Sequence, residues 1–272
     1  MRPAPDFAAR SVAGTRHIWA GRPCEDACHS RAEGGVVAVA LADGHGSSAR
    51  GADGAIMAVQ SATSGLMALH RSLAAAGLVD PRTYREVARA PFGRTLVQAW
   101  QSEVQRRADV RALDRPSESP DLALTRRYGS TLMAALVTPE VVLCLALGDG
   151  ATLWVSAEQQ VSRPLGVDPH AFADETSSLC QLGAWRDLRV AAWTPPPEGG
   201  VLLMMTDGYV NSYADEPTLD GVAIDYARLI GAHGLPTVGA QLPTFLRSVS
   251  DGGCGDDVSL ALIHLPPTES LR

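Results

Sequence analysis

The chain has 272 residues, of which 46% are hydrophobic, and its formal net charge at pH 7 is -7. Such a length can bury a substantial core, and the acidic balance argues against holding nucleic acid or an anionic membrane by bulk electrostatics. No apolar run reaches the ~18 residues of a membrane span, and the N-terminus lacks the apolar core of a secretory signal. We therefore expect a soluble cytoplasmic protein whose five scattered cysteines are reduced.

The first third of the chain is predicted to form two strands and a long helix. Extended segments are expected around "SVAGTRHIW" (11–19) and "GGVVAVALA" (34–42), with the turn-rich "AGRPCEDACHSRAEGG" (20–35) between them. The second strand runs into Asp-Gly-His-Gly at 43–46, and Asp-Gly after an apolar run is also typical of an ordinary turn. The alanine-rich stretch 48–78 has apolar residues near helical spacing and predicts a helix.

The middle of the chain is predicted to change from helix to antiparallel sheet. A helical stretch from about Tyr84 to Leu113 contains Pro91, which should kink or divide it. The polar "DRPSESPD" (114–121) is expected to be an exposed loop. Residues 130–156, "STLMAALVTPEVVLCLALGDGATLWVS", are predicted to form a three-stranded antiparallel meander, because no crossover helix fits between the strands.

The last third is expected to begin with an irregular surface flap at about 160–200, which is rich in proline and contains a short strand at "DLRVAAW" (187–193). After it we expect a strand, two helices and a final strand, at 201–206, 219–233, 238–249 and 255–265. Antiparallel strand groups separated by helix pairs favour a single α+β domain over 1–272. The predicted architecture is a four-layer α-β-β-α sandwich of two mainly antiparallel sheets flanked by helices.

Three of the apolar strands run into an acidic residue, namely Asp43, Asp149 and Asp207. Strand ends of both sheets meet along one edge of such a sandwich, so these carboxylates can converge there. Closely packed carboxylates repel one another unless cations neutralise them. Oxygen ligands without a matching set of histidines or thiolates favour magnesium or manganese over zinc. The further candidates are Glu25, Asp26, Asp256 and Asp257, and together these residues predict a two-metal centre.

Six segments then occur in an order typical of one enzyme family: "CEDAC", "LADGHGSS", "YGSTLMAAL", "LALGDGATLWV", "MMTDGYVNS" and "GDDVSLALI". From about Gly14 to Leu265 the chain resembles the metal-dependent Ser/Thr protein phosphatases of type 2C, in a compact bacterial branch. The resemblance implies the same sandwich, two manganese or magnesium ions, and hydrolysis of phosphoserine and phosphothreonine in proteins. It also implies a phosphorylated protein partner and an opposing bacterial Ser/Thr kinase.

The resemblance assigns ligand roles to residues that match the motifs. Asp43 would bridge both metals, and Gly44 would offer its backbone carbonyl to one of them. The other metal's shell would be completed by Asp207 and Asp256, with Glu25 and Asp26 contributing directly or through ordered water. A third metal site would lie between Asp149 and Asn211. It would be weak, because Asn211 provides an amide where relatives often carry an acid.

Catalytic and phosphate-binding roles also follow from the resemblance. Two bound metals would activate a water molecule for direct attack on phosphorus, without a phosphoenzyme. His45 is expected to protonate the leaving alkoxide, and hydrogen bonding to a metal-bound water is the alternative. Many relatives place a phosphate-binding arginine where this chain has Gly21. Arg22 is one residue closer to Glu25. It would bind phosphate if a turn at Pro23 directs its guanidinium into the site, and would otherwise be solvent-exposed. His17 is interpreted as structural.

Two other functions remain open at this stage. A two-metal phosphatase of nucleotides or small phosphoesters would use the same site chemistry, with a different surrounding surface. An inactive phosphoprotein-binding module is the other alternative. It is disfavoured because Asp43, Asp207 and Asp256 are all present.

Overall fold

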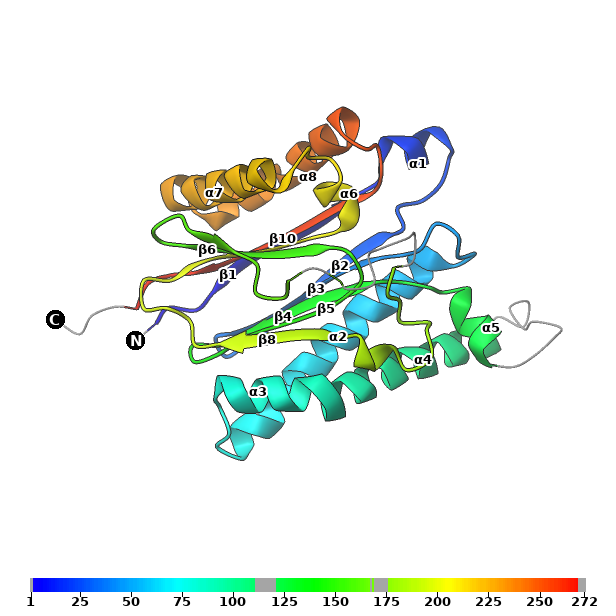
Figure 1. Cartoon of the computed structure of the whole chain (residues 1–272), viewed down its shortest axis with the longest axis horizontal. Helices are drawn as coiled ribbons and strands as arrows, with labels where there is room; N and C mark the ends of the chain where they lie inside the picture. The colour runs from blue at the N-terminus through cyan, green and yellow to red at the C-terminus, as the bar shows by residue number, and fades with distance from the viewer. Residues whose placement is uncertain (1, 111–120, 167, 169–175, 269–272) are drawn as a thin grey trace.

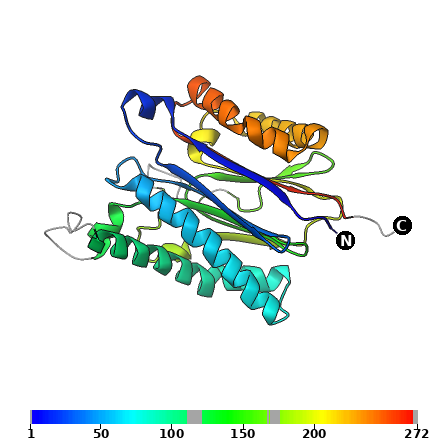
Figure 2. The same ribbon diagram turned by 180° about the vertical axis from the view of Figure 1, so that it is seen from behind.

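The computed structural model describes residues 2–110, 121–166, 168 and 176–268. Two five-stranded antiparallel sheets stack face to face, and helices cover both outer faces (Figures 1 and 2). The first sheet has the order β1 (Asp6–Val12), β10 (Val258–Leu265), β9 (Gly200–Met205), β6 (Ala151–Ser156) and β7 (Val161–Ser162). The second has the order β2 (Asp26–Glu33), β3 (Val36–Asp43), β4 (Leu132–Val137), β5 (Val142–Leu147) and β8 (Arg189–Trp193). The predicted α-β-β-α sandwich is confirmed.

The helices form the two outer layers. Against the second sheet, α2 (Gly51–Ala75) packs on β2 and β3. Beside it, α3 (Pro81–Val87) packs on β5 and β8, and a π-helical turn (Ala88–Phe92) leads into α4 (Gly93–Val110), which packs on α2. On the opposite side, α7 (Glu216–His233) and α8 (Leu235–Gly252) cover the first sheet (Figure 1). The short helix α5 (Asp121–Arg126) precedes β4, and the short helix α6 (Asp207–Val210) follows β9. Both strands lead to the cavity described below.

The interior strand β3 shows how the layers are specified. Its Val37, Val39 and Leu41 are buried between the two sheets, where they meet apolar residues of β9 and β10. The alternate positions Ala38 and Ala40 face α2 on the other side. Because side chains alternate across a strand, one apolar run fills two cores at once. The small alanines let α2 approach the sheet closely.

Residues 11–35 differ from the sequence prediction. The segment expected to extend through residue 19 stops at Val12 and then forms the short helix α1 (Thr15–Trp19). The segment expected to be a turn-rich loop contains β2, which pairs with β3 from Asp26 to Glu33. The two errors have different causes. The α1 backbone is held by the distant loop at 250–257. In contrast, β2 forms a hairpin with β3 through a two-residue turn at Gly34 and Gly35, whose φ angles are +58° and +80°.

The predicted meander is correct only in its first hairpin. Strands β4 and β5 pair as expected, but β6 leaves this sheet and pairs with β9 in the other one. The crossing occurs at Gly148, where φ is +110°, and at Gly150, whose added Cβ would lie 2.7 Å from the Met205 carbonyl oxygen. Only glycine tolerates both conditions. The edge of β5 at which β6 was expected pairs with β8 instead, and this confirms the short strand expected within 187–193.

The helix predictions hold where they can be compared with the structure. The long helix expected at 48–78 is α2, and Pro91 lies in the π-helical turn that joins α3 to α4. Most of the loop expected at 114–121, and part of the flap expected at 160–200, lie outside the described residues. Each helix within the described ranges is too short or too polar to cross a lipid bilayer.

Candidate active site

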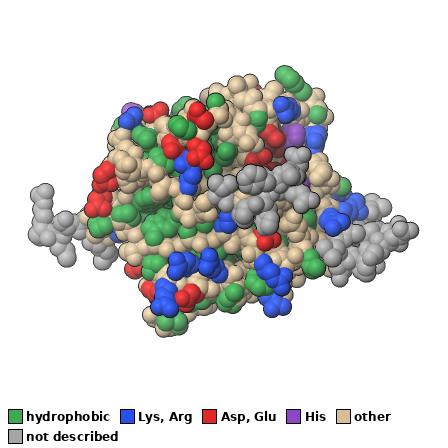
Figure 3. Space-filling view, in the orientation of Figure 1, with side chains coloured by type: hydrophobic (Ala, Val, Ile, Leu, Met, Phe, Trp, Pro, Cys, Tyr) green, Lys and Arg blue, Asp and Glu red, His purple; other side chains and the backbone are tan. Residues whose placement is uncertain are grey.

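A cavity of about 580 Å³ lies where strand ends of the two sheets meet. Asp43 ends β3 in the second sheet, Asp207 follows β9 in the first, and Asp256 precedes β10. Figure 3 shows acidic side chains gathered beside a histidine on the face viewed in Figure 1. The lining residues in the described part of the chain are His17, Glu25, Asp43, Gly44, His45, Gly46, Ser47, Arg126, Asp149, Thr176, Ser178, Cys180, Gln181, Asp207, Asp256 and Asp257. Thus the three acidic strand ends predicted from the sequence, Asp43, Asp149 and Asp207, line one cavity.

The carboxylates in this cavity perturb one another. Burial raises the pKa of Asp43 well above its ordinary value, and the neighbouring Asp26 and Asp207 raise it further. Burial, followed by the charge of Asp149, raises the pKa of Asp207 to about 6. Asp43 and Asp207 are close enough for a hydrogen bond between their carboxyl groups. Like charges at this spacing oppose full ionisation unless a cation lies between them.

The glycine after Asp43 is required by the packing of the chain itself. A Cβ on Gly44 would lie 2.3 Å from the carbonyl carbon of Gly51, at the start of α2. The Gly44 amide donates to the carbonyl of Glu25 (3.1 Å), which ties the strand end to the acidic loop. The sequence interpretation explains this glycine only by access to its carbonyl. The structure adds a steric reason, because no other residue fits between β3 and α2 here.

The two acidic residues at the start of β2 face different surroundings. Glu25 lines the cavity, whereas Asp26 is buried between the sheets and is absent from the lining. Asp26 Oδ2 accepts hydrogen bonds from the hydroxyls of Thr206 (2.8 Å) and Ser259 (2.7 Å). Burial is the main reason that its pKa rises to about 8, and the two hydroxyls oppose that rise. Asp26 therefore lies beneath the cavity and links the acidic loop of the second sheet to the first.

Arg22 lies beside the cavity rather than in its lining. Its Nη2 donates to Glu25 Oε1 (2.7 Å) and to the carbonyl of Gly46 (3.4 Å), and the side chain is 42% exposed. It lines an adjoining groove together with the first residues of α2. The basic side chains that line the cavity itself, within the described ranges, are His17, His45 and Arg126. Arg126 lies outside the motifs on which the sequence interpretation was based. It is the last residue of α5, so the placement of that helix before β4 determines where Arg126 lies.

His45 enters the cavity immediately after the strand end. Its backbone amide donates to the carbonyl of Gly129 (3.0 Å). A Cβ on Gly129 would lie 2.7 Å from His45 Cδ2, so the ring packs against a bare backbone. Burial lowers the pKa of His45, and the charge of Asp149 opposes that shift. The imidazole is thus positioned by packing, beside the carboxylates.

Of the two residues expected at a third metal site, Asp149 lines the cavity and Asn211 does not. Asp149 lines the cavity and accepts a hydrogen bond from the Thr176 hydroxyl (3.0 Å). Asn211 is exposed at the end of α6, where its amide donates to Asp207 Oδ2 (3.3 Å). Its nitrogen is thereby directed at the carboxylate. His17, interpreted as structural from the sequence, lines the cavity.

The donor set fits hard divalent cations. Six carboxylates line the cavity, namely Glu25, Asp43, Asp149, Asp207, Asp256 and Asp257. Among the residues that the structure describes, no three His, Cys, Asp or Glu side chains are already arranged around one point as a complete ligand set. Carboxylate and carbonyl oxygens in a polar, open cavity match magnesium and manganese, which also retain water ligands.

Comparisons with known proteins agree with this arrangement. A search of curated protein sequences finds no match. Three similar solved structures are a Mycobacterium tuberculosis serine/threonine phosphatase, PstP/Ppp (16% identity, TM-score 0.61, covering 98% of this chain and 100% of that one), an S. agalactiae serine/threonine phosphatase (15%, 0.59, 97% and 100%) and PppA of Pseudomonas aeruginosa (18%, 0.57, 97% and 99%). At these identities the likeness shows the shared fold.

The sequence itself identifies the family. The family model described as "Protein phosphatase 2C" matches residues 13–247, which is most of the chain. The match begins just before α1 and includes the acidic loop, the end of β3 and the start of α6, so it contains Glu25, Asp43 and Asp207. This protein belongs to the protein phosphatase 2C family of serine/threonine phosphatases.

Proposed function

We propose that this protein hydrolyses phosphoserine and phosphothreonine in proteins with the help of two manganese or magnesium ions. The observation that carries the proposal is the cavity where carboxylates from both sheets meet beside His45. Asp43 would be shared by both ions, and Asp207 and Asp256 would hold one of them. Gly44 would offer its carbonyl, and Glu25 and Asp26 would act directly or through ordered water.

The bound cations would offset the carboxylate charge and lower the pKa of a water molecule for attack on phosphorus. The protein's own residues supply the rest of the chemistry. Asp43 fixes the position of the reaction at the junction of the two sheets. His45 donates a proton to the departing serine or threonine oxygen, which would otherwise leave as a strongly basic alkoxide. Asp149, with Asn211 nearby, would form at most a weaker third cation site.

The lining favours a phosphoprotein over a nucleotide as substrate. Among the described lining residues there is no Phe, Tyr or Trp, so the cavity offers no aromatic face on which a base could stack. A phosphorylated side chain needs only its phosphoryl group and a short stem to enter. The described end of the flap contributes Thr176, Ser178 and Gln181 to the wall, where polar groups can contact a peptide.

The cellular setting that we propose is the cytoplasm, where the protein would oppose a serine/threonine kinase. All five cysteines are free thiols, which suits a reducing compartment. Phosphoserine and phosphothreonine are products of kinases, so a phosphatase of this class needs such a partner activity. The kinase's substrate, or the kinase itself, would supply the phosphorylated residue.

The test is hydrolysis of a phosphoserine or phosphothreonine peptide by the purified protein with manganese. We expect activity that stops with a chelator and returns when metal is restored. Asp43→Asn should lower kcat/KM by far more than tenfold, ~1.4 kcal/mol, because it removes a shared ligand. Asp225→Asn, in an exposed i,i+3 pair with Arg228 on α7, is the control and should retain full activity. Full activity in chelator, or a loss below tenfold for Asp43→Asn, would contradict the proposal.

A further inference from the structure

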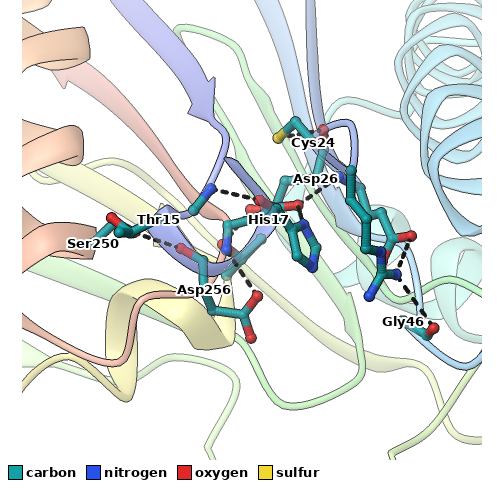
Figure 4. Close-up of polar contacts among 12 residues, drawn as sticks. Thr15, His17, Cys24, Asp26, Gly46, Ser250 and Asp256 are labelled. Atoms are coloured by element: carbon teal, nitrogen blue, oxygen red, sulfur yellow. Dashed lines mark hydrogen bonds and ion pairs between the residues drawn. The ribbon is translucent and has the colours of Figure 1, made fainter. Parts of the chain in front are cut away.

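His17 occupies an unusual position in the wall of the cavity. It belongs to α1, a five-residue helix in which no residue is fully buried. The backbone of α1 is held by the loop that carries Asp256. The Thr15 amide donates to Ser250 Oγ (3.1 Å) and the Arg16 amide donates to the Gly255 carbonyl (3.0 Å). Figure 4 shows His17 beside Asp256, between that loop and the segment at Gly46. The helix therefore places an imidazole against the acidic cluster.

The buried carboxylate of Asp257 fixes the orientation of this imidazole. Asp257 Oδ1 accepts the amide of Gly14 (2.6 Å), and Oδ2 accepts the amide of Glu25 (2.5 Å). His17 Nδ1 lies 2.8 Å from the same Oδ2. A carboxylate that already accepts two N–H groups accepts a third, so Nδ1 carries a proton. The second ring nitrogen, Nε2, has no hydrogen-bond partner among the residues that the structure describes.

A donor at this position would help to bind a phosphoryl group. Such a group brings negative charge into a space already lined by six carboxylates, and Arg22 is engaged with Glu25 outside the lining. The basic side chains that line the cavity in the described part of the chain are His17, His45 and Arg126, and His17 is the one oriented by a buried carboxylate. The His17 side chain is 13% exposed and lines the cavity, and its ring is held 2.8 Å from the Asp257 carboxylate. Hydrogen bonds between charged partners are the strong ones, and a fixed ring loses little freedom in making them.

We propose that His17 binds a phosphoryl oxygen of the substrate through Nε2, and that Asp257 is the positioning residue that holds the ring. This inference rests on the proposed function of the cavity as a phosphatase site. It extends that function because Arg22, the candidate expected from the sequence, does not line the cavity. The position of His17 allows two competing roles: a metal ligand, or a side chain that only ties α1 to the Asp257 loop.

Two conservative variants separate these roles, because asparagine and glutamine each reproduce one ring nitrogen. His17→Asn keeps a donor near the Nδ1 position and can retain the bond to Asp257, but it removes the nitrogen that faces the cavity. His17→Gln keeps a donor near the Nε2 position and gives up the bond to Asp257. We expect His17→Asn to weaken phosphate binding at least tenfold and His17→Gln to weaken it less. A role confined to holding α1 requires the opposite order.

The measurement is calorimetric titration of inorganic phosphate into the magnesium-loaded protein, which needs no turnover. Magnesium affinity, titrated separately, should be the same in both variants and in the unmodified protein. A loss of magnesium affinity in His17→Asn would overturn the proposal in favour of a metal ligand. Unchanged phosphate affinity in His17→Asn would overturn it as well. Thermal midpoints of the variants identify any loss that is due to unfolding.

The role of Asp257 is tested by whether the effect of Asp257→Asn on phosphate binding depends on His17. Asp257→Asn should weaken phosphate binding when His17 is present, and should have little effect in the His17→Gln background, because glutamine does not use the carboxylate. Equal losses in both backgrounds would show that Asp257 acts only on the fold. In steady-state assays, His17→Asn should raise KM by a similar factor for a phosphopeptide and an aryl phosphate, with kcat little changed.

The two proposals can fail separately. If no phosphopeptide is hydrolysed with any divalent metal, the proposed function fails, yet the order of phosphate affinities still reports on His17. If hydrolysis is normal and His17→Asn binds phosphate as well as the unmodified protein does, only the inference about His17 fails.

Discussion

His17 and His45 reach the same cavity with different support. The ring of His17 is oriented by a buried carboxylate 2.8 Å away. The ring of His45 is held by packing against Gly129, and burial lowers its pKa. A ring held by a carboxylate suits binding of an anion. A ring that has no side-chain hydrogen bond to the described residues, beside the strand end that carries Asp43, suits transfer of a proton.

This difference gives a prediction for His45. His45→Ala should slow hydrolysis of a phosphoserine peptide at least tenfold more than hydrolysis of an aryl phosphate, because a phenolate leaves with little help from an acid. The measurement is kcat for both substrates at saturating manganese. Equal losses on the two substrates would indicate that His45 positions a water molecule instead. His17→Asn serves as the comparison, because its loss should not depend on the leaving group.

At the scale of single elements, α2 is the support of the site. It starts directly behind Gly44 and packs along β2 and β3. Its Gly54 meets the turn before β4 so closely that an added Cβ would lie 1.9 Å from the Tyr128 carbonyl oxygen. The buried Trp100 of α4 donates to the Gly54 carbonyl (3.0 Å). The same turn leads to Gly129, which contacts His45, so the packing of α2 also positions a cavity residue.

Gly54→Ala should therefore destabilise the protein by about 1–3 kcal/mol or more, because the clash is with backbone and the helix has to shift. The matched control is Gly221→Ala on α7, where a Cβ would meet nothing within 4 Å. That substitution should stabilise the helix by roughly 0.5–1 kcal/mol. Denaturant unfolding followed by circular dichroism measures both changes. If both variants gained stability, the close contact between α2 and the Tyr128 turn would be wrong.

At the scale of the whole molecule, the acidic cavity is also a joint between the two sheets. Asp43 belongs to the second sheet, whereas Asp207 and Asp256 follow and precede strands of the first. Asp26 joins the sheets beneath them through the Thr206 and Ser259 hydroxyls. Carboxylates that repel one another across this joint oppose the stacking of the sheets, and cations that bind them favour it.

Metal should accordingly stabilise the fold as well as support activity. A cation that binds only the native state at a hundred times its Kd adds ~2.7 kcal/mol per site, so manganese should raise the calorimetric unfolding midpoint and chelator should lower it. In chelator, Asp43→Asn should be at least as stable as the unmodified protein, because one repulsive charge is gone. With manganese it should gain much less. An equal gain from manganese in both proteins would exclude Asp43 as a ligand that joins the sheets.

Much of this molecule could be predicted from local sequence patterns. The alanine-rich period of α2 and the apolar runs of β3, β5 and β9 specify their elements because burial acts on each segment directly. Acidic residues after such runs must lie at strand ends, and antiparallel strands of two stacked sheets bring their ends to one edge. That reasoning sufficed for the architecture and for the convergence of Asp43, Asp149 and Asp207.

Other features depended on partners far away in the chain. Helix α1 forms on the loop at 250–257, and β6 leaves β5 to pair with β9 in the other sheet. The same holds for side chains. Asp26 is directed inward because two hydroxyls from the first sheet lie there, and Arg22 is held outside the cavity by Glu25. His17 lines the cavity with its Nδ1 held 2.8 Å from Oδ2 of Asp257, 240 residues later. Local pattern fixes which segments are buried, whereas the direction of a polar side chain is fixed by hydrogen-bond partners that only the tertiary structure brings to it.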